Sequence, residues 1–124
     1  MRLSGSAQFE KVYAAKTRAS AGPLLVYGIP NDLNHMRLGL AAPRRIGTAV
    51  IRNTIKRKLR EAFRLQPHEW SELGRGYDVV INVRPHEPLS TKEYQRDLLS
   101  AVKKLHATWM KRSQTQPTPD RPER

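Results

Sequence analysis

The densest group of chemically active side chains is a run of arginines and lysines between positions 44 and 64. Arg52, Lys56 and Arg60 recur every four residues, on one face of a helix, and Glu61 is the only acidic residue between positions 37 and 64. Like charges at this spacing repel, so the pattern favours a bound anion. Arginine can grip a phosphate with two hydrogen bonds, and lysine binds it as a point charge. The candidate phosphate-binding residues are Arg44, Arg45, Arg52, Asn53, Lys56, Arg57, Arg60 and Arg64.

These residues alone also permit an ordinary amphipathic helix with a solvated basic face. The two arginines that precede the helix, Arg44 and Arg45, favour the phosphate-binding interpretation because they extend the positive surface beyond a single helix.

Aromatic side chains form a second group that can bind nucleic acid. Phe9 and Tyr13 are one helical turn apart, and Tyr27 lies in a short apolar run. Rings of this kind hold single-stranded nucleic acid by stacking on its bases, at roughly 1–3 kcal/mol per base. A stripe made of Phe9 and Val12 would instead face the core, and the residues alone leave both interpretations open.

Residues for catalysis or metal binding are sparse, and we expect no catalytic or metal-binding residue in the protein itself. The chain has no cysteine, its acidic residues form no cluster that could hold two metal ions, and Gly74-Arg75-Gly76 lacks the Gly-Lys-Ser/Thr ending of a phosphate loop. The histidines are His35, His68, His86 and His106, and their spacing is not that of metal ligands.

Composition also indicates a polyanionic partner. The 124 residues include 23 Lys and Arg against 11 Asp and Glu, a net charge of +12. A soluble domain of this size needs a net charge of only about 2–8. The excess is typical of proteins that bind nucleic acid, an anionic membrane surface or an acidic protein. No apolar run approaches the roughly 20 residues of a membrane helix, and no secretory signal is evident, so we expect a cytoplasmic protein that does not enter the membrane.

The chain has room for one small domain, at residues 7–111, between a flexible N-terminus (1–6) and a disordered Pro-rich basic tail (112–124). Periodicity predicts helices at 7–15, at 48–65 (closed by Pro67) and from a capping box at Ser90–Glu93 to about 111. It predicts strands at 23–29, 37–41 and 77–83, the first two pairing as an antiparallel hairpin. The order α-β-β-α-β-α predicts a small sheet covered by helices, an α/β or α+β fold.

The segment 38–64 resembles the bacterial ribonuclease P protein family. Its signature, Gly-x-Ala-Val-x-Arg-Asn-x-x-Lys-Arg-x-x-Arg-Glu, is matched at every fixed position from Gly47 to Glu61. The segment 9–13 resembles the first helix of the family and 77–81 its last main strand, so the resemblance spans roughly residues 8–110. Lys16, Pro43 and Thr54 depart from the family, which commonly has glycine, serine and a basic residue at these positions.

The resemblance implies a ribosomal-protein-like fold, a mixed sheet with a left-handed β-α-β crossover, where a right-handed one is the general rule. It implies that the basic residues bind the ribonuclease P RNA and that Phe9, Tyr13 and Tyr27 bind the 5′ leader of precursor tRNA. The activity implied is endonucleolytic removal of that leader, with Mg²⁺ and the chemistry held by the RNA. No small-molecule substrate is expected.

Composition leaves three alternatives, which the signature disfavours. A general or ribosomal RNA-binding protein would share the same charge. A DNA-binding protein would need a helix-turn-helix partner or a dimer seam, and neither is visible. A protein-only nuclease would need the missing carboxylate cluster.

Overall fold

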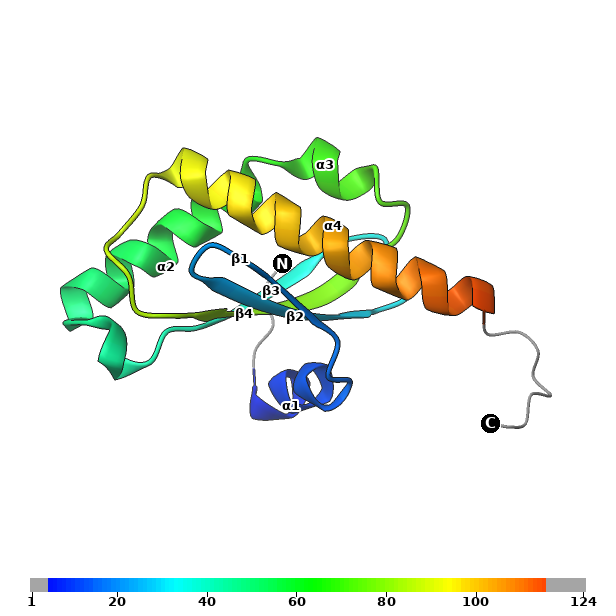
Figure 1. The fold of residues 1–124 in the computed structure, drawn as a ribbon, viewed down its shortest axis with the longest axis horizontal. Coiled ribbons are helices and arrows are strands. Elements are labelled where there is room, and N and C mark those ends of the chain that lie inside the picture. The colour runs from blue at the N-terminus through cyan, green and yellow to red at the C-terminus, as the bar shows by residue number, and fades with distance from the viewer. Residues whose placement is uncertain (1–4, 116–124) are drawn as a thin grey trace.

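The computed structural model describes residues 5–115, which fold around one four-stranded sheet (Figure 1). In chain order the elements are α1 (Ser6–Ala14), β1 (Arg18–Ala21), β2 (Leu24–Pro30), β3 (Arg37–Ala41), the 3-10 turn η1 (Arg44–Ile46), α2 (Ala49–Arg64), α3 (Pro67–Ser71), β4 (Tyr77–Val83) and α4 (Thr91–Thr115). Helices α2, α3 and α4 lie on one side of the sheet and α1 lies on the other (Figure 1). The predicted α+β class is confirmed.

The strands are ordered β1-β2-β4-β3, which corrects one predicted pairing. β2 and β3 do not form a hairpin, because β4 lies between them, antiparallel to β2 and parallel to β3. β4 takes the central position because its residues are apolar enough to be covered on both faces. The parallel β3–β4 pair makes α2 the connection of a β-α-β unit.

The actual hairpin joins β2 to β1, a strand that periodicity did not predict. β1 has only four residues, two of them polar (Arg18 and Ser20), so it carries little apolar signal. Its turn to β2 contains Gly22, whose φ of 56° lies in the left-handed region that glycine adopts without strain. Residues 22 and 23 therefore form a tight turn between the paired strands.

The core lies between the sheet and the two long helices. Helical periodicity predicts one apolar stripe on each of these helices, and most of its members are buried: Ile55, Leu59 and Ala62 of α2, and Tyr94, Leu98, Ala101, Val102 and Leu105 of α4. The other predicted members, Ile51, Phe63 and Trp109, are half-buried. The predicted capping box is also present, since the Glu93 amide donates to Ser90 Oγ at 3.1 Å and the Ser90 amide donates to Glu93 Oε1 at 2.9 Å.

Two helix ends differ from the prediction. Pro67 does not only close α2 but also begins α3, where its missing N–H costs no hydrogen bond. α4 continues to Thr115, so residues 112–115 are helical and not part of a tail. The rest of the predicted tail, and positions 1–4 of the predicted flexible N-terminus, lie outside the described residues.

Candidate nucleic-acid interface

The phosphate-binding candidates of η1 and α2 form one positive surface, which we call the basic row. Its members are Arg44, Arg45, Arg52, Asn53, Lys56, Arg57, Arg60 and Arg64. Thr48 caps the start of α2, where its hydroxyl accepts from the Ile51 amide at 3.2 Å. The buried apolar stripe of α2 turns its cationic face away from the core. Arg44, Arg45, Asn53, Arg57 and Arg64 are exposed, while Arg52, Lys56 and Arg60 are half-buried. The buried side chain of Ile46 fixes η1 just before α2.

Within residues 5–115, most of this charge has no acidic partner. Arg64 forms an exposed ion pair with Glu61 at 2.8 Å, and no other member of the basic row pairs with an acidic residue among residues 5–115. Arg52 Nε donates to the Gly47 carbonyl at 3.3 Å, which orients its guanidinium near the start of the helix. In contrast, Lys58 donates to the Leu89 carbonyl at 3.0 Å and ties α2 to the loop before α4.

The three predicted aromatic residues meet on the opposite face of the sheet, where α1 packs. The rings of Tyr13 and Tyr27 meet edge to face, with centroids 4.9 Å apart, and Phe9 lies 6.5 Å from Tyr13. Tyr13 Oη donates to Asn82 Oδ1 at 3.0 Å, and Arg18 Nη1 donates to Tyr27 Oη at 3.3 Å. Lys16 joins Arg18 and the two tyrosines around an open pocket of about 410 Å³.

Phe9 differs from the two tyrosines because it anchors α1 to the sheet. Its ring lies directly over Gly39 of β3, so close that a Cβ there would be 2.6 Å from Phe9 Cζ. It also packs against the small cluster formed by Val12, Ile29 and Val80. The ring is half-buried against the core and borders the tyrosine pair, so Phe9 is a packing residue and its stacking on a base stays a prediction.

Three polar residues of this aromatic cluster were not predicted from the sequence: Lys16, Arg18 and Asn82. Asn82 had a signal, because it is a polar residue within the otherwise apolar run 79–83. Lys16 adopts a φ of 56°, a conformation that glycine adopts more readily, which explains the glycine that is common there in the resembling family. Arg18 had no signal, because β1 itself was not predicted.

A buried ion pair fixes the same face at the other end of β4. Asp78 accepts from Arg37 Nε at 2.8 Å, from Arg37 Nη2 at 2.7 Å and from Asn31 Nδ2 at 2.8 Å. Burial raises the pKa of Asp78, but the hydrogen bonds from Arg37 and Asn31 outweigh it, so the pKa of this carboxyl lies below its ordinary value. The ion pair links β3 to β4 and so stabilises the part of the sheet against which α1 packs.

Across residues 5–115, no group of three or more His, Asp or Glu side chains is placed to hold a metal ion. Within the same residues, no helix is long and apolar enough to cross a membrane. The arrangement can bind an anionic, base-containing polymer.

Comparisons with known proteins agree with this geometry. A family model described as Ribonuclease P matches residues 1–106. The ribonuclease P protein component of Photobacterium profundum is 42% identical over 94 residues, covering 75% of this chain and 77% of that relative. The corresponding protein of Alkaliphilus oremlandii is 30% identical over 106 residues, covering 85% of this chain and 90% of its own length.

Solved structures show the same fold. The ribonuclease P protein of Staphylococcus aureus superposes with a TM-score of 0.67 at 30% identity, over 82% of this chain and 92% of that chain. That of Thermotoga maritima gives a TM-score of 0.65 at 26% identity, over 81% and 93% of the two chains. The chain therefore belongs to the ribonuclease P protein family, the protein component of an endoribonuclease that works with an RNA partner.

Proposed function

We propose that this protein binds the catalytic ribonuclease P RNA through the basic row and the 5′ leader of precursor tRNA through the aromatic cluster. In this role it assists the RNA in cutting the leader from the precursor. The observation that carries the proposal is the separation of the two surfaces: the cationic residues of α2 lie on one side of the sheet, and Tyr13 and Tyr27 lie on the other.

Each surface has the chemistry its proposed ligand needs. A folded RNA presents dense phosphates, which the arginines and lysines of α2 neutralise with release of condensed counterions. A single-stranded leader presents unstacked bases, which suit the Tyr13–Tyr27 pair, and its phosphates suit Lys16 and Arg18 beside them. Asn82 adds an amide that can hydrogen-bond to a base edge if Tyr13 releases it.

We further propose that Mg²⁺ is held by the RNA subunit and supplies the charge stabilisation at the scissile phosphate. The part played by this chain is electrostatic. A body of net charge +12 beside folded RNA lowers phosphate–phosphate repulsion, so that a lower concentration of divalent ions is needed.

The proposal is tested by cleavage of a precursor tRNA by a bacterial ribonuclease P RNA at low Mg²⁺, with and without this protein. We expect strong stimulation and an unchanged cleavage site. A folded protein that binds RNA without stimulating cleavage would instead support a general RNA-binding role. Competition with duplex DNA at fixed salt distinguishes the DNA-binding alternative.

The leader assignment has its own test, the ratio of holoenzyme affinities for precursor and mature tRNA. Tyr27→Ala should lower this ratio by about 5- to 150-fold, equivalent to one stacked base, while leaving RNA-subunit binding unchanged. Tyr27→Phe is the matched control, since it keeps the ring and loses only the bond from Arg18. An unchanged ratio in Tyr27→Ala would remove this residue from the leader site.

A further inference from the structure

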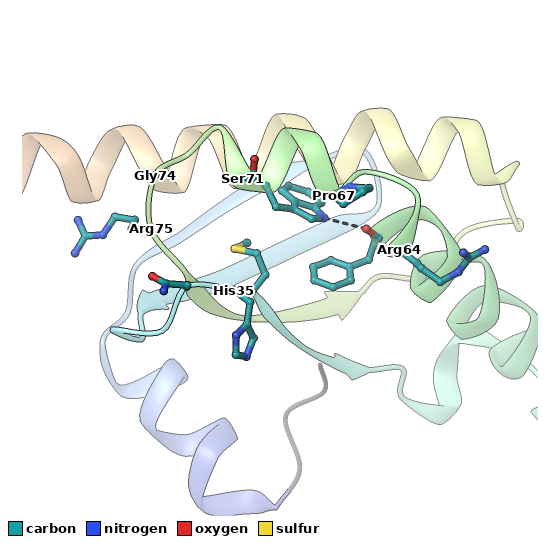
Figure 2. A pocket seen from close by; sticks show the side chains of 10 residues that line it. His35, Arg64, Pro67, Ser71, Gly74 and Arg75 are labelled. Atoms are coloured by element: carbon teal, nitrogen blue, oxygen red, sulfur yellow. Dashed lines mark hydrogen bonds between the residues drawn. The ribbon is translucent and has the colours of Figure 1, made fainter.

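A second pocket lies away from the aromatic cluster, where the end of α2, the short helix α3 and the loop before β3 meet (Figure 2). It has a volume of about 420 Å³. Apolar side chains, Met36, Phe63 and Trp70, form its floor, and His35, Arg64 and Arg75 stand at its rim. The proposed function uses only Arg64 of this set.

The floor is a preformed aromatic surface. Phe63 and Trp70 stack with centroids 5.5 Å apart and an interplanar angle of 26°. Trp70 Nε1 donates to the Phe63 carbonyl at 2.9 Å, the dashed line in Figure 2, so the polar atom of the indole is already satisfied. A flat apolar guest can therefore enter without leaving a buried donor unpaired.

The rim is cationic, and none of the ten residues that line the pocket is acidic. Arg64 and Arg75 stand at opposite ends of it with their guanidinium groups directed outward, so each side chain must turn inward to meet a bound phosphate (Figure 2). Arg75 lies 5.7 Å from the centre of the Tyr77 ring and contacts Met110 Sδ at 4.0 Å, and it pairs with no carboxylate in residues 5–115. The ion pair of Arg64 with Glu61 is exposed, and pairs of this kind contribute little, so a phosphate can replace the carboxylate.

A planar apolar floor between two cations fits a nucleotide, whose base stacks while its phosphates meet the arginines. We propose that this pocket binds an unpaired nucleotide of the ribonuclease P RNA. The inference rests on the proposed function, in which the basic row binds this RNA. Four members of the basic row, Arg52, Lys56, Arg60 and Arg64, extend about 18 Å along α2, and the last of them lines the pocket. An RNA strand that follows these four residues reaches the pocket, whereas the proposed leader site lies on the other face of the sheet.

The test compares two chemically identical changes in the full chain. Ser71 is exposed on α3 and lines the pocket, and Ser100 is exposed on α4 and does not. The probe is a bacterial ribonuclease P RNA without precursor, with its Watson–Crick edges mapped by chemical modification. Wild type and Ser100→Leu should protect an unpaired nucleotide, and Ser71→Leu should leave it reactive and weaken binding by about 5- to 150-fold.

Arg75→Gln gives a second readout that does not depend on filling the pocket. It should lower the slope of log affinity against log salt by about 0.9, the value for one lost phosphate contact, while Arg96→Gln on the exposed side of α4 should not. Photocrosslinking from p-benzoylphenylalanine at position 72, which is exposed beside the pocket and is not one of its lining residues, then identifies the source. A crosslink to the RNA subunit supports the proposal, and a crosslink only to precursor tRNA, or to neither RNA, overturns it.

The outcomes separate this inference from the function on which it rests. If wild type binds the RNA and Ser71→Leu binds it equally well with the same protections, the pocket assignment fails and the basic row stands. If Ser71→Leu and Ser100→Leu lose affinity equally, the effect does not come from the pocket and the proposal fails. If wild type itself does not bind the RNA, the proposed function fails.

Discussion

On one face of the sheet lie the long helices α2 and α4, and on the other, within residues 5–115, lies the nine-residue helix α1 alone (Figure 1). The first face builds the main core and exposes charge on the far side of α2. The second face is only partly covered, and Leu25 and Asn82 on its strands remain half-buried. The comparison shows two ways to make a surface suited to the proposed binding. One is a helix that can carry charge because its other side is buried, and the other is a sheet left partly open by a short helix.

The largest expected effect is on RNA affinity, when three cations of the basic row are removed and the aromatic cluster is left intact. The triple variant Arg52→Ala, Lys56→Ala, Arg60→Ala should weaken binding of ribonuclease P RNA on the order of 100-fold or more and lower the salt slope by about 3, since three phosphate contacts are lost. Filter binding at several salt concentrations measures both. Lys92→Ala with Arg96→Ala, on the exposed side of α4, is the charge control, and an equal loss in that pair would mean that net charge alone matters.

Two glycines test the independence of the two faces. In Gly39→Ala the new methyl group collides with Phe9, so α1 should be displaced, with a stability loss of about 1–2 kcal/mol and faster hydrogen exchange in α1. Preference for precursor over mature tRNA should fall with it. In Gly28→Ala the methyl group meets Leu105 of α4 at 3.1 Å, on the opposite face. That variant should lose stability while exchange in α1 keeps its wild-type pattern, and a change in α1 there would break the comparison.

Low pH should lower the free energy of unfolding by protonating Asp78, which supports the face where α1 packs. Because the pKa of Asp78 is lower in the folded than in the unfolded chain, the stability it contributes is complete above about pH 4 and is lost as the pH falls through the folded pKa. Asp78→Asn should lower stability by about 1.5 kcal/mol at neutral pH. Urea unfolding across pH should show this difference shrinking below pH 4. A difference that stays constant to lower pH would mean that the carboxylate charge is not the source.

The smallest effect concerns Lys16, whose left-handed backbone costs an L-residue roughly 1–2 kcal/mol, partly offset by the greater unfolded-state entropy of glycine. Lys16→Gly should raise stability by about 0.5–1 kcal/mol and slightly weaken leader binding, because a cation of the tyrosine pocket is lost. Asp32→Gly is the control, since Asp32 has a φ of 59° and lies outside that pocket. Equal leader affinities in the two variants would show that Lys16 does not contact the leader.

Much of the fold could be predicted because long apolar periods determine it. The stripes of α2 and α4, the capping box at Ser90 and the limits of β4 followed from residue spacing alone. The pairing of β2 with β3 was wrong because adjacency in sequence suggested a hairpin, while the position of β4 between them depends on contacts distant in the chain. Short elements with few apolar residues, β1 and α3, gave too weak a signal.

The candidate sites divide in the same way. The helical repeat determines which side chains share one face of a helix, so the basic row could be predicted from residue spacing. The aromatic cluster combines α1, β1, β2 and β4, and periodicity could not show that Tyr13 reaches Asn82, which is 69 positions away. The pocket at Trp70 depends on α3 and on the loop before β3, neither of which carries a recognisable motif.

The central place of β4 also determines when each surface can exist during folding. Leu24 of β2 cannot pair with Val83 until the chain has passed through β3, α2 and α3, so the sheet closes only after a long loop has been ordered. Val80 and Asn82, on which α1 and Tyr13 rest, arrive with that strand. On a ribosome, α2 can emerge and become helical while β2 and β3 still expose unpaired edges. The proposed leader-binding face would then mature after α2, and RNA that binds α2 early would act as a folding template for the rest.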